Sequence, residues 1–133
     1  MLQLGRSFAE NAKPGDTFGL IGELGTGKTQ WTRGFMDIIH PTARTSSPTF
    51  GFVNEYRGGL FTVFHFDFFR LKSASELLSI GWDDYLEEPA IIICEWASLF
   101  PHLLPENTLW LKFEHLTGDR RRLTQSPQPP PQP

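Results

Sequence analysis

The sequence has little cysteine, and this scarcity limits the kinds of protein that it can encode. Cys94 is the single cysteine among 133 residues. One thiol excludes an internal disulfide framework and any zinc site that needs several thiolates. Because Cys94 lies inside an apolar run, we expect it to be an inert core residue.

Long hydrophobic runs and an excess of positive charge are lacking as well. No stretch approaches the roughly 20 apolar residues that cross a bilayer, and no basic start followed by a short apolar core indicates secretion. The net charge of −3 argues against a protein that binds nucleic acid mainly through bulk positive charge. We therefore expect a cytoplasmic protein that does not associate with membranes.

Proline is unevenly distributed along the chain. The last ten residues, 124–133, contain five of the eleven prolines and no charged side chain. Such a segment cannot bury enough apolar surface to offset the entropy of ordering it. We predict one domain over residues 1–123, followed by a disordered, proline-rich tail over residues 124–133.

A glycine-rich segment carries the strongest chemical signal. Residues 22–29 (GELGTGKT) match the pattern G-x-x-x-x-G-K-[ST] in full. The apolar run at 17–21 predicts a buried strand before the segment, and the apolar spacing over 31–39 predicts a helix after it. A phosphate-binding loop requires this order, because the loop N–H groups and the helix N-terminus both attract anions. Lys28 would reach the β- and γ-phosphates, and the Thr29 hydroxyl would complete the shell of a bound Mg²⁺.

Such a site also needs a carboxylate near the metal, and two residues qualify. Glu95 directly follows the apolar run 91–94, where a metal-linked acid is expected. Asp67 follows the extended run 60–66. Both could serve one Mg²⁺, or one could orient the attacking water. The alternatives are that Glu95 is a solvated residue at a strand end and that Asp67 only caps a turn. We expect His65 to be structural.

The rest of the chain predicts further strands and short helices. The expected elements are a hairpin over 49–56 and 60–66, a helix opened by a capping box at 73–76, a second short helix over 82–86, a central, parallel strand over 90–94, and a half-exposed strand over 108–114. The polar segment 42–48 either senses a γ-phosphate or only connects elements.

Five motifs, in this order, resemble the TsaE family. They are GELGTGKT (22–29), SSPTF (46–50), HFDFFRL (65–71), ICEW (93–96) and LLPEN (103–107). The resemblance implies an α/β fold, a compact P-loop NTPase-like arrangement whose mostly parallel sheet is flanked by helices. It also implies ATP binding and slow hydrolysis with Mg²⁺, together with the partners TsaB and TsaD. In that family, this activity supports the formation of tRNA threonylcarbamoyladenosine (t6A).

The resemblance also implies roles for particular residues. Lys28, Glu95 and Asp67 would be catalytic, and Thr29, Glu95 and Asp67 would be the metal ligands. The implied cofactor-binding residues are Gly22, Glu23, Leu24, Gly25, Thr26, Gly27, Lys28, Thr29 and Arg120. Because Arg120 begins a run of three arginines, the register of this last assignment is open.

The chain departs from the family pattern in three places. The family usually has an N-terminal strand before its first helix, whereas this chain begins inside the helix, around residues 2–5. Phe69 stands where the motif HxDxYR has tyrosine, which removes a hydroxyl. The proline-rich end takes the place of the closing strand and helix of the family.

Two other functions are compatible with the residues. The chain could be a nucleotide-dependent binding module with negligible turnover on its own, because no arginine is a clear candidate for stabilising the transition state. A small-molecule kinase is a third interpretation, although 123 residues leave little room for an acceptor-binding lid. Whether the protein touches tRNA directly stays open.

Overall fold

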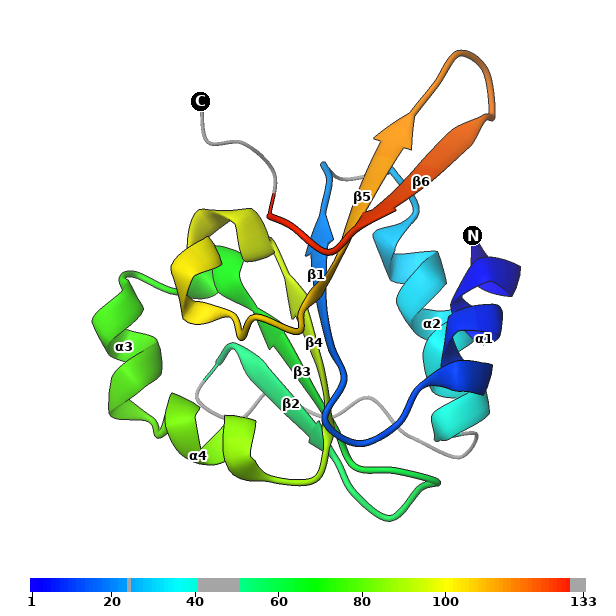
Figure 1. Ribbon diagram of the computed structural model, residues 1–133. Coiled ribbons are helices and arrows are strands. Elements are labelled where there is room, and N and C mark those ends of the chain that lie inside the picture. The colour runs from blue at the N-terminus through cyan, green and yellow to red at the C-terminus, as the bar shows by residue number, and fades with distance from the viewer. Residues whose placement is uncertain (24, 41–50, 130–133) are drawn as a thin grey trace.

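The computed structural model describes residues 1–23, 25–40 and 51–129, which form a mixed sheet between two layers of helices (Figure 1). The sheet has six strands in the order β2-β3-β4-β1-β5-β6. The strands are β1 Thr17–Ile21, β2 Val53–Tyr56, β3 Val63–Asp67, β4 Ile91–Glu95, β5 Leu109–His115 and β6 Arg121–Ser126. The four inner strands run parallel, while β2 and β6 pair antiparallel at the two edges. The predicted α/β class, the mostly parallel sheet and the central strand at 90–94 are confirmed.

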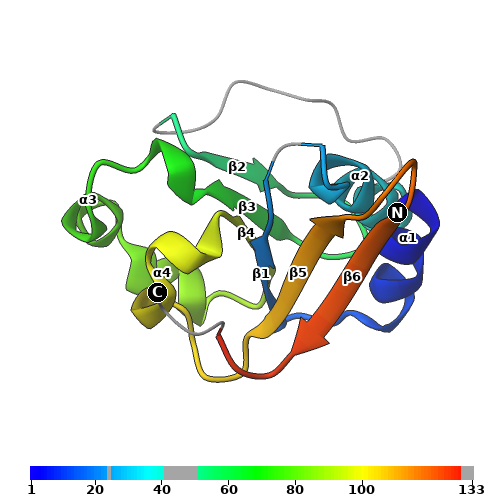
Figure 2. The ribbon, with the colours of Figure 1, turned by 90° about the horizontal axis from the view of Figure 1, so that it is seen from above.

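Helices cover both faces of this sheet. Helices α1 (Leu2–Asn11) and α2 (Lys28–Ile39) lie on one face, and α3 (Ala74–Ser79) and α4 (Trp82–Glu87) lie on the other (Figures 1 and 2). Three 3₁₀ turns, η1 (Phe68–Arg70), η2 (Ala97–Leu99) and η3 (Pro101–Leu103), complete the second layer. Within the described residues, no helix is both long and apolar enough to cross a bilayer.

Alternation along the buried strands divides their side chains between two cores. In β4, Ile91 and Ile93 pack toward α1 and α2, whereas Ile92 and Cys94 pack toward the opposite layer. Both sets are buried, as expected for a strand with a neighbour on each side and a helix layer on each face. Burial raises the pKa of the Cys94 thiol well above its usual range, so it stays protonated, as expected for an inert core residue.

Two glycines allow α1 and α2 to approach closely. A Cβ atom at Gly5 would collide with the Trp31 carbonyl group, and one at Gly34 would collide with the Leu2 carbonyl group. The contact therefore requires residues without a Cβ atom at both positions. It does not depend on the freedom of glycine to adopt unusual backbone angles. Because α2 begins directly after the glycine-rich segment, this contact helps to hold that segment in place.

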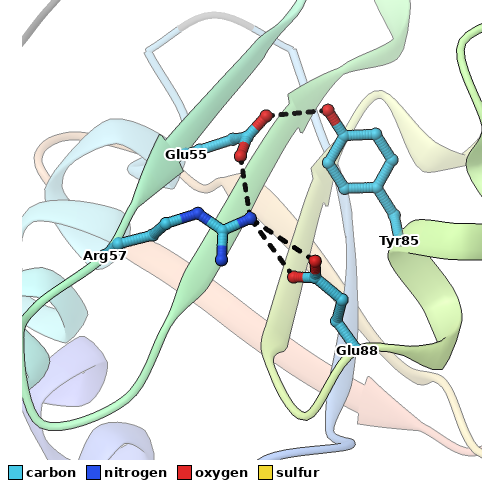
Figure 3. A network of polar contacts seen from close by, with 4 residues as sticks. All are labelled: Glu55, Arg57, Tyr85 and Glu88. Carbon is cyan, nitrogen blue, oxygen red and sulfur yellow. Dashed lines mark hydrogen bonds and ion pairs between the residues drawn. The ribbon is translucent and has the colours of Figure 1, made fainter.

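A polar network fastens the edge strand β2 to helix α4 (Figure 3). The Tyr85 hydroxyl donates to Glu55 Oε2 at 2.8 Å, and Arg57 donates to Glu55 Oε1 at 3.1 Å. Arg57 also contacts Glu88 Oε2 at 3.3 Å. Burial, together with the hydrogen bond to Glu55 and its negative charge, raises the pKa of Tyr85 to about 12. The network supports the strand next to β3, which carries His65 and Asp67.

Three sequence predictions are wrong in detail. The predicted disordered tail over residues 124–133 is wrong for its first three residues, because Thr124, Gln125 and Ser126 belong to β6 and pair with β5. The open edge of β5 supplies backbone partners that composition cannot reveal. Residues 130–133 lie outside the described part of the chain.

The other two concern a helix cap and a strand face. The Ser73 side chain makes no capping bond to α3, and Glu76 accepts from the Lys72 N–H at 2.9 Å instead of closing a capping box with Ser73. In the half-exposed strand predicted over 108–114, alternation puts Trp110 on the same face as Lys112 and Glu114, yet Trp110 is only 5% exposed. Its ring is covered because it packs against Gly19, where the missing side chain leaves room.

We predict that Gly5→Ala lowers the free energy of unfolding by about 2 kcal/mol or more, because overpacking forces α1 away from α2. In an uncrowded helix the same change would stabilise the protein by about 1 kcal/mol. Urea denaturation followed by circular dichroism measures the difference.

The matched control is Ser7→Ala on the exposed side of the same helix. We expect that variant to be as stable as the wild type or slightly more stable. A Gly5→Ala protein that is as stable as Ser7→Ala would show that the two helices do not need this close contact.

Candidate functional site

The glycine-rich segment forms a tight loop between β1 and α2. Strand β1 ends at Ile21, and α2 begins at Lys28, with Gly27 as its N-cap at φ 105°. Gly22 has φ 150°, and a Cβ atom there would lie 2.7 Å from the Phe113 carbonyl oxygen. Glycine is therefore required at both positions. Gly27 needs it for its backbone angle, and Gly22 needs it because the loop approaches β5 closely there. Thr26 closes the loop by donating to the Glu23 carbonyl at 2.6 Å. Leu24 lies outside the described residues.

Lys28 is buried with a charge that has no hydrogen-bond partner among the described residues. Its side chain is 4% exposed, and its Nζ atom lies 4.2 Å from the centre of the Trp96 ring. Burial lowers the pKa of Lys28, although the charges of Glu95 and Asp67 act in the opposite direction. The lysine of the glycine-rich motif thus carries an ammonium group with no hydrogen-bond partner among the described residues, at the start of α2.

The two predicted carboxylates lie side by side. Asp67 ends β3 and Glu95 ends β4, and the register pairs them across the two parallel strands. Both are close enough to Lys28 to affect its pKa. The structure therefore brings Lys28, Asp67 and Glu95 together at the carboxyl edge of the sheet, where ligands of open α/β sheets bind.

Glu95 is held by a neighbour on β3. Its Oε2 atom lies 2.8 Å from His65 Nε2, and both side chains are mostly buried. Burial opposes ionisation of Glu95, but the hydrogen bond from His65 and the charges of His65 and Lys28 outweigh it, so the pKa of Glu95 is lowered. Glu95 is thus an ionised carboxylate at neutral pH and not merely a solvated strand end.

Asp67 caps a turn, as one of the two alternatives predicted, and it also lies at the cleft. Its Oδ1 atom accepts from the Phe69 N–H at 3.1 Å and caps the turn η1. Its Oδ2 atom lies 3.5 Å from Arg70 Nε. The residue is a cap, and its carboxylate still lines the same cleft as Lys28.

Trp96, the last residue of the ICEW motif, also lines this cleft. It is the one non-glycine residue with positive φ in the described part of the chain, at 57°. Its ring lies beside Lys28 on one side and 5.0 Å from the ring of Phe69. A backbone conformation this rare in non-glycine residues marks a place where the surrounding structure imposes the geometry. The only sequence signal for it is its position after Glu95.

A cleft of about 350 Å³ connects these side chains. It is lined by Glu23, Gly25, Gly27, Lys28, Thr29, Gln30, Asp67, Glu95, Trp96 and Arg121. Its volume lies within the range of small-molecule sites. A second hollow of about 400 Å³, between α1 and strands β1 and β5, contains none of the predicted site residues.

The arginine at this cleft is Arg121 and not Arg120. Arg121 lines the cleft, and its Nε donates to the Gly25 carbonyl at 2.9 Å, whereas Arg120 does not line it. Strand β6 begins at Arg121, which pairs with His115 of β5. Three consecutive arginines look equivalent in the sequence, and the pairing of β6 with β5 selects one of them.

The donors at the cleft suit Mg²⁺ bound together with phosphates. The described residues contain no group of three or more His, Cys, Asp or Glu side chains placed to hold a metal ion by themselves. Mg²⁺ at phosphate sites commonly takes only one or two carboxylates and fills its shell with phosphate oxygens and water. Asp67, Glu95 and the exposed Thr29 hydroxyl fit that requirement.

The strand–loop–helix unit and the parallel sheet define a P-loop α/β protein, and known proteins narrow the class further. The sequence profile of TsaE, described as threonylcarbamoyl adenosine biosynthesis protein TsaE, matches residues 1–123. The chain belongs to the TsaE family.

Individual relatives agree with this assignment. The tRNA threonylcarbamoyladenosine biosynthesis protein TsaE of Bacillus subtilis is 36% identical over 113 residues, which are 85% of this chain and 70% of the relative. The protein of the same name from Haemophilus influenzae is 32% identical over 125 residues, covering 90% and 79% of the two chains. The crystal structure of Bacillus subtilis YdiB superposes with a TM-score of 0.76 at 29% identity, covering 93% of this chain and 76% of YdiB.

We predict that Lys28→Met raises the free energy of unfolding at pH 7 by about 1 kcal/mol, because it removes a buried charge that lacks a hydrogen-bond partner among the described residues. The pKa of Lys28 is lower in the folded than in the unfolded protein. The wild type therefore gains stability as the pH rises through the folded pKa, and its deficit against Lys28→Met shrinks towards pH 10. Thermal or urea unfolding at several pH values measures this.

The control is Lys112→Met, which changes an exposed lysine on β5. We expect little change in stability for that variant. If Lys28→Met is less stable than the wild type at pH 7, the buried ammonium is better compensated than its surroundings indicate.

Proposed function

We propose that this protein binds ATP with Mg²⁺ in the cleft at the carboxyl edge of the sheet and hydrolyses ATP slowly. In this proposal it acts in the cytoplasm with TsaB and TsaD and supports the formation of t6A in tRNA. The observation that carries the proposal is the buried Lys28 ammonium, which lies between a glycine loop and two carboxylates. Membership in the TsaE family supplies the biosynthetic context.

The loop and α2 would hold the phosphates. Backbone N–H groups of a glycine loop and the N-terminus of the following helix attract phosphate oxygens. Lys28 Nζ would move from the face of the Trp96 ring to the β- and γ-phosphates, where its charge gains a stronger partner. Gly22, Gly25 and Gly27 all have positive φ, and this backbone shape is the one that opens such a loop toward an anion.

The carboxylates would act on the other side of the phosphates. Thr29, Asp67 and Glu95 would hold Mg²⁺, which when bound neutralises phosphate charge and polarises the bond to be broken. Glu95, which is kept ionised, would also orient or deprotonate the attacking water. Asp67 has one oxygen on the η1 cap and the other near Arg70, so its orientation is held by both contacts.

The arginines near the cleft in the described part of the chain support the proposal of slow turnover by the isolated protein. Arg70 is occupied by Asp67 and by the Gly51 carbonyl at 3.4 Å. Arg121 is bonded to the Gly25 carbonyl. An arginine that is free to stabilise the transition state is worth about 10³-fold or more in such reactions. We infer that rapid hydrolysis requires a rearrangement or a group supplied by a partner.

The same observation favours the binding module as the second candidate. If neither arginine is released, ATP or ADP would act as a switch for partner binding, without turnover. Direct contact with tRNA is not part of the proposal, since the net charge of −3 provides no general attraction for phosphates.

The central test measures ATP hydrolysis by the protein alone and with TsaB and TsaD. We expect slow hydrolysis alone, faster hydrolysis with the partners, and a loss of about 10²-fold or more in Glu95→Gln, because the attacking water loses its base. Glu87→Gln, on an exposed part of α4, is the matched control. Tight nucleotide binding without hydrolysis in any mixture would favour the binding module, and phosphate transfer to a small acceptor would refute both.

A second test separates the neighbouring arginines. We expect Arg121→Ala to weaken ATP binding by about 10-fold, since it removes both a charge at the cleft and the bond to the loop. We expect Arg120→Ala to bind ATP as the wild type does. Isothermal titration calorimetry with both variants decides between them, and an equal loss in the two would mean that only the overall charge of the hairpin matters.

A further inference from the structure

His65 and Glu95 form a contact between neighbouring strands inside the site. His65 lies in the middle of β3, and Glu95 ends β4 two positions beyond the residue that pairs with His65. The Nε2–Oε2 distance is 2.8 Å, and the two side chains are 17% and 22% exposed. Only Oε2 of Glu95 takes part in this contact, so Oε1 is available to another group.

Lys28 and Glu95 carry opposite charges in the same cleft, and they form no ion pair with each other. Their charges are close enough to shift each other's pKa. Instead of approaching the carboxylate, Lys28 Nζ lies over the Trp96 ring at 4.2 Å. The Glu95 carboxylate is thus held by His65 and the Lys28 ammonium group by Trp96, and the two charged groups do not hold each other.

We propose that His65 is a positioning residue that holds Glu95 away from Lys28, so that the site does not close on itself when no ligand is bound. His65 binds the carboxylate, and the Trp96 ring receives the ammonium group. The biological meaning of this arrangement rests on the function proposed above, while the arrangement itself concerns only side chains of this chain.

The physical reason is competition for a partially buried charge. Attraction between opposite charges is strong where water is scarce, so an unrestrained Glu95 would swing toward Lys28 and pair with it. A closed Lys28–Glu95 pair would cancel the charge that attracts phosphate and the charge that attracts a cation. A ligand would then have to break the pair before binding. His65 removes this cost because it offers Glu95 a hydrogen-bond donor on the side away from the loop.

The surroundings of His65 agree with this role. A small hollow of about 130 Å³ lies on its side of the carboxylates and is lined by His65, Asn54, Asp67, Arg70 and Glu95 among others. Asn54 pairs with His65 across β2 and β3. Glu95 therefore has polar neighbours on the side of His65, apart from Lys28.

The decisive experiment is a pair of crystal structures without nucleotide. His65→Phe keeps a ring of similar size and removes the donor, while His65→Gln keeps a donor near the position of Nε2. We expect Lys28 Nζ and a Glu95 oxygen to lie within about 4 Å in His65→Phe, as an ion pair does. We expect them to stay apart in His65→Gln. If His65→Phe does not fold, His65→Leu replaces it as the variant without a donor.

A binding measurement adds a second test. A loss of packing alone would not weaken binding in His65→Phe and restore it in His65→Gln. We expect His65→Phe to bind Mn²⁺ with ADP about 10-fold or more weakly, the usual loss when a residue supporting a metal ligand is removed. His65→Gln should restore most of the affinity. His102→Phe, an exposed histidine on η3, serves as the control with unchanged affinity.

The proposal is overturned if Glu95 stays away from Lys28 in the donor-free variant, or if the glutamine variant closes in the same way. Because both crystals lack nucleotide, this result is independent of the proposed function. A wild type that binds no nucleotide would refute the proposed function alone.

Discussion

The rest of the site depends on one constraint, the burial of the Lys28 ammonium at the start of α2. A buried charge is costly unless something compensates it. Here the compensation is partial: the face of Trp96 lies against Nζ, and two carboxylates stand nearby without bonding to it. Trp96, the residue whose ring lies over the lysine, also has an unusual backbone conformation, with φ 57°. An anion that entered the cleft would give the Lys28 ammonium group the hydrogen-bond partner that the described residues do not supply.

The scaffold positions that lysine from two directions. On one side, the close contact between α1 and α2 through Gly5 and Gly34 fixes the helix on which Lys28 lies. On the other side, the parallel strands β3 and β4 end together, so Asp67 and Glu95 reach the same edge. The hydrophobic cores on both faces of the sheet hold these elements at a fixed distance.

Three polar side chains of the cleft, Glu95, Asp67 and Arg121, are each held by a neighbour. The Glu95 carboxylate contacts His65. The Asp67 carboxylate accepts from the Phe69 N–H of η1 and contacts Arg70, and Arg121 donates to the Gly25 carbonyl. This is the pattern of a preorganised site, in which ligand binding exchanges existing contacts for stronger ones. Among the described residues, the two arginines next to the carboxylates and the loop, Arg70 and Arg121, already have partners in this way.

The sequence by itself determined the local chemistry, because the glycine loop, its lysine and the flanking strand and helix are contiguous and obey short-range rules of backbone geometry and periodicity. It also identified Glu95 and Asp67, since a polar residue at the end of a buried strand is visible in the pattern. Only the tertiary structure decided which residues meet across strands. The choice of Arg121 over Arg120, the contact of His65 with Glu95 and the extension of β6 to Ser126 all depend on strand register. Register is a relation between two strands, so a pattern read along one strand does not show which residue of the other strand lies opposite.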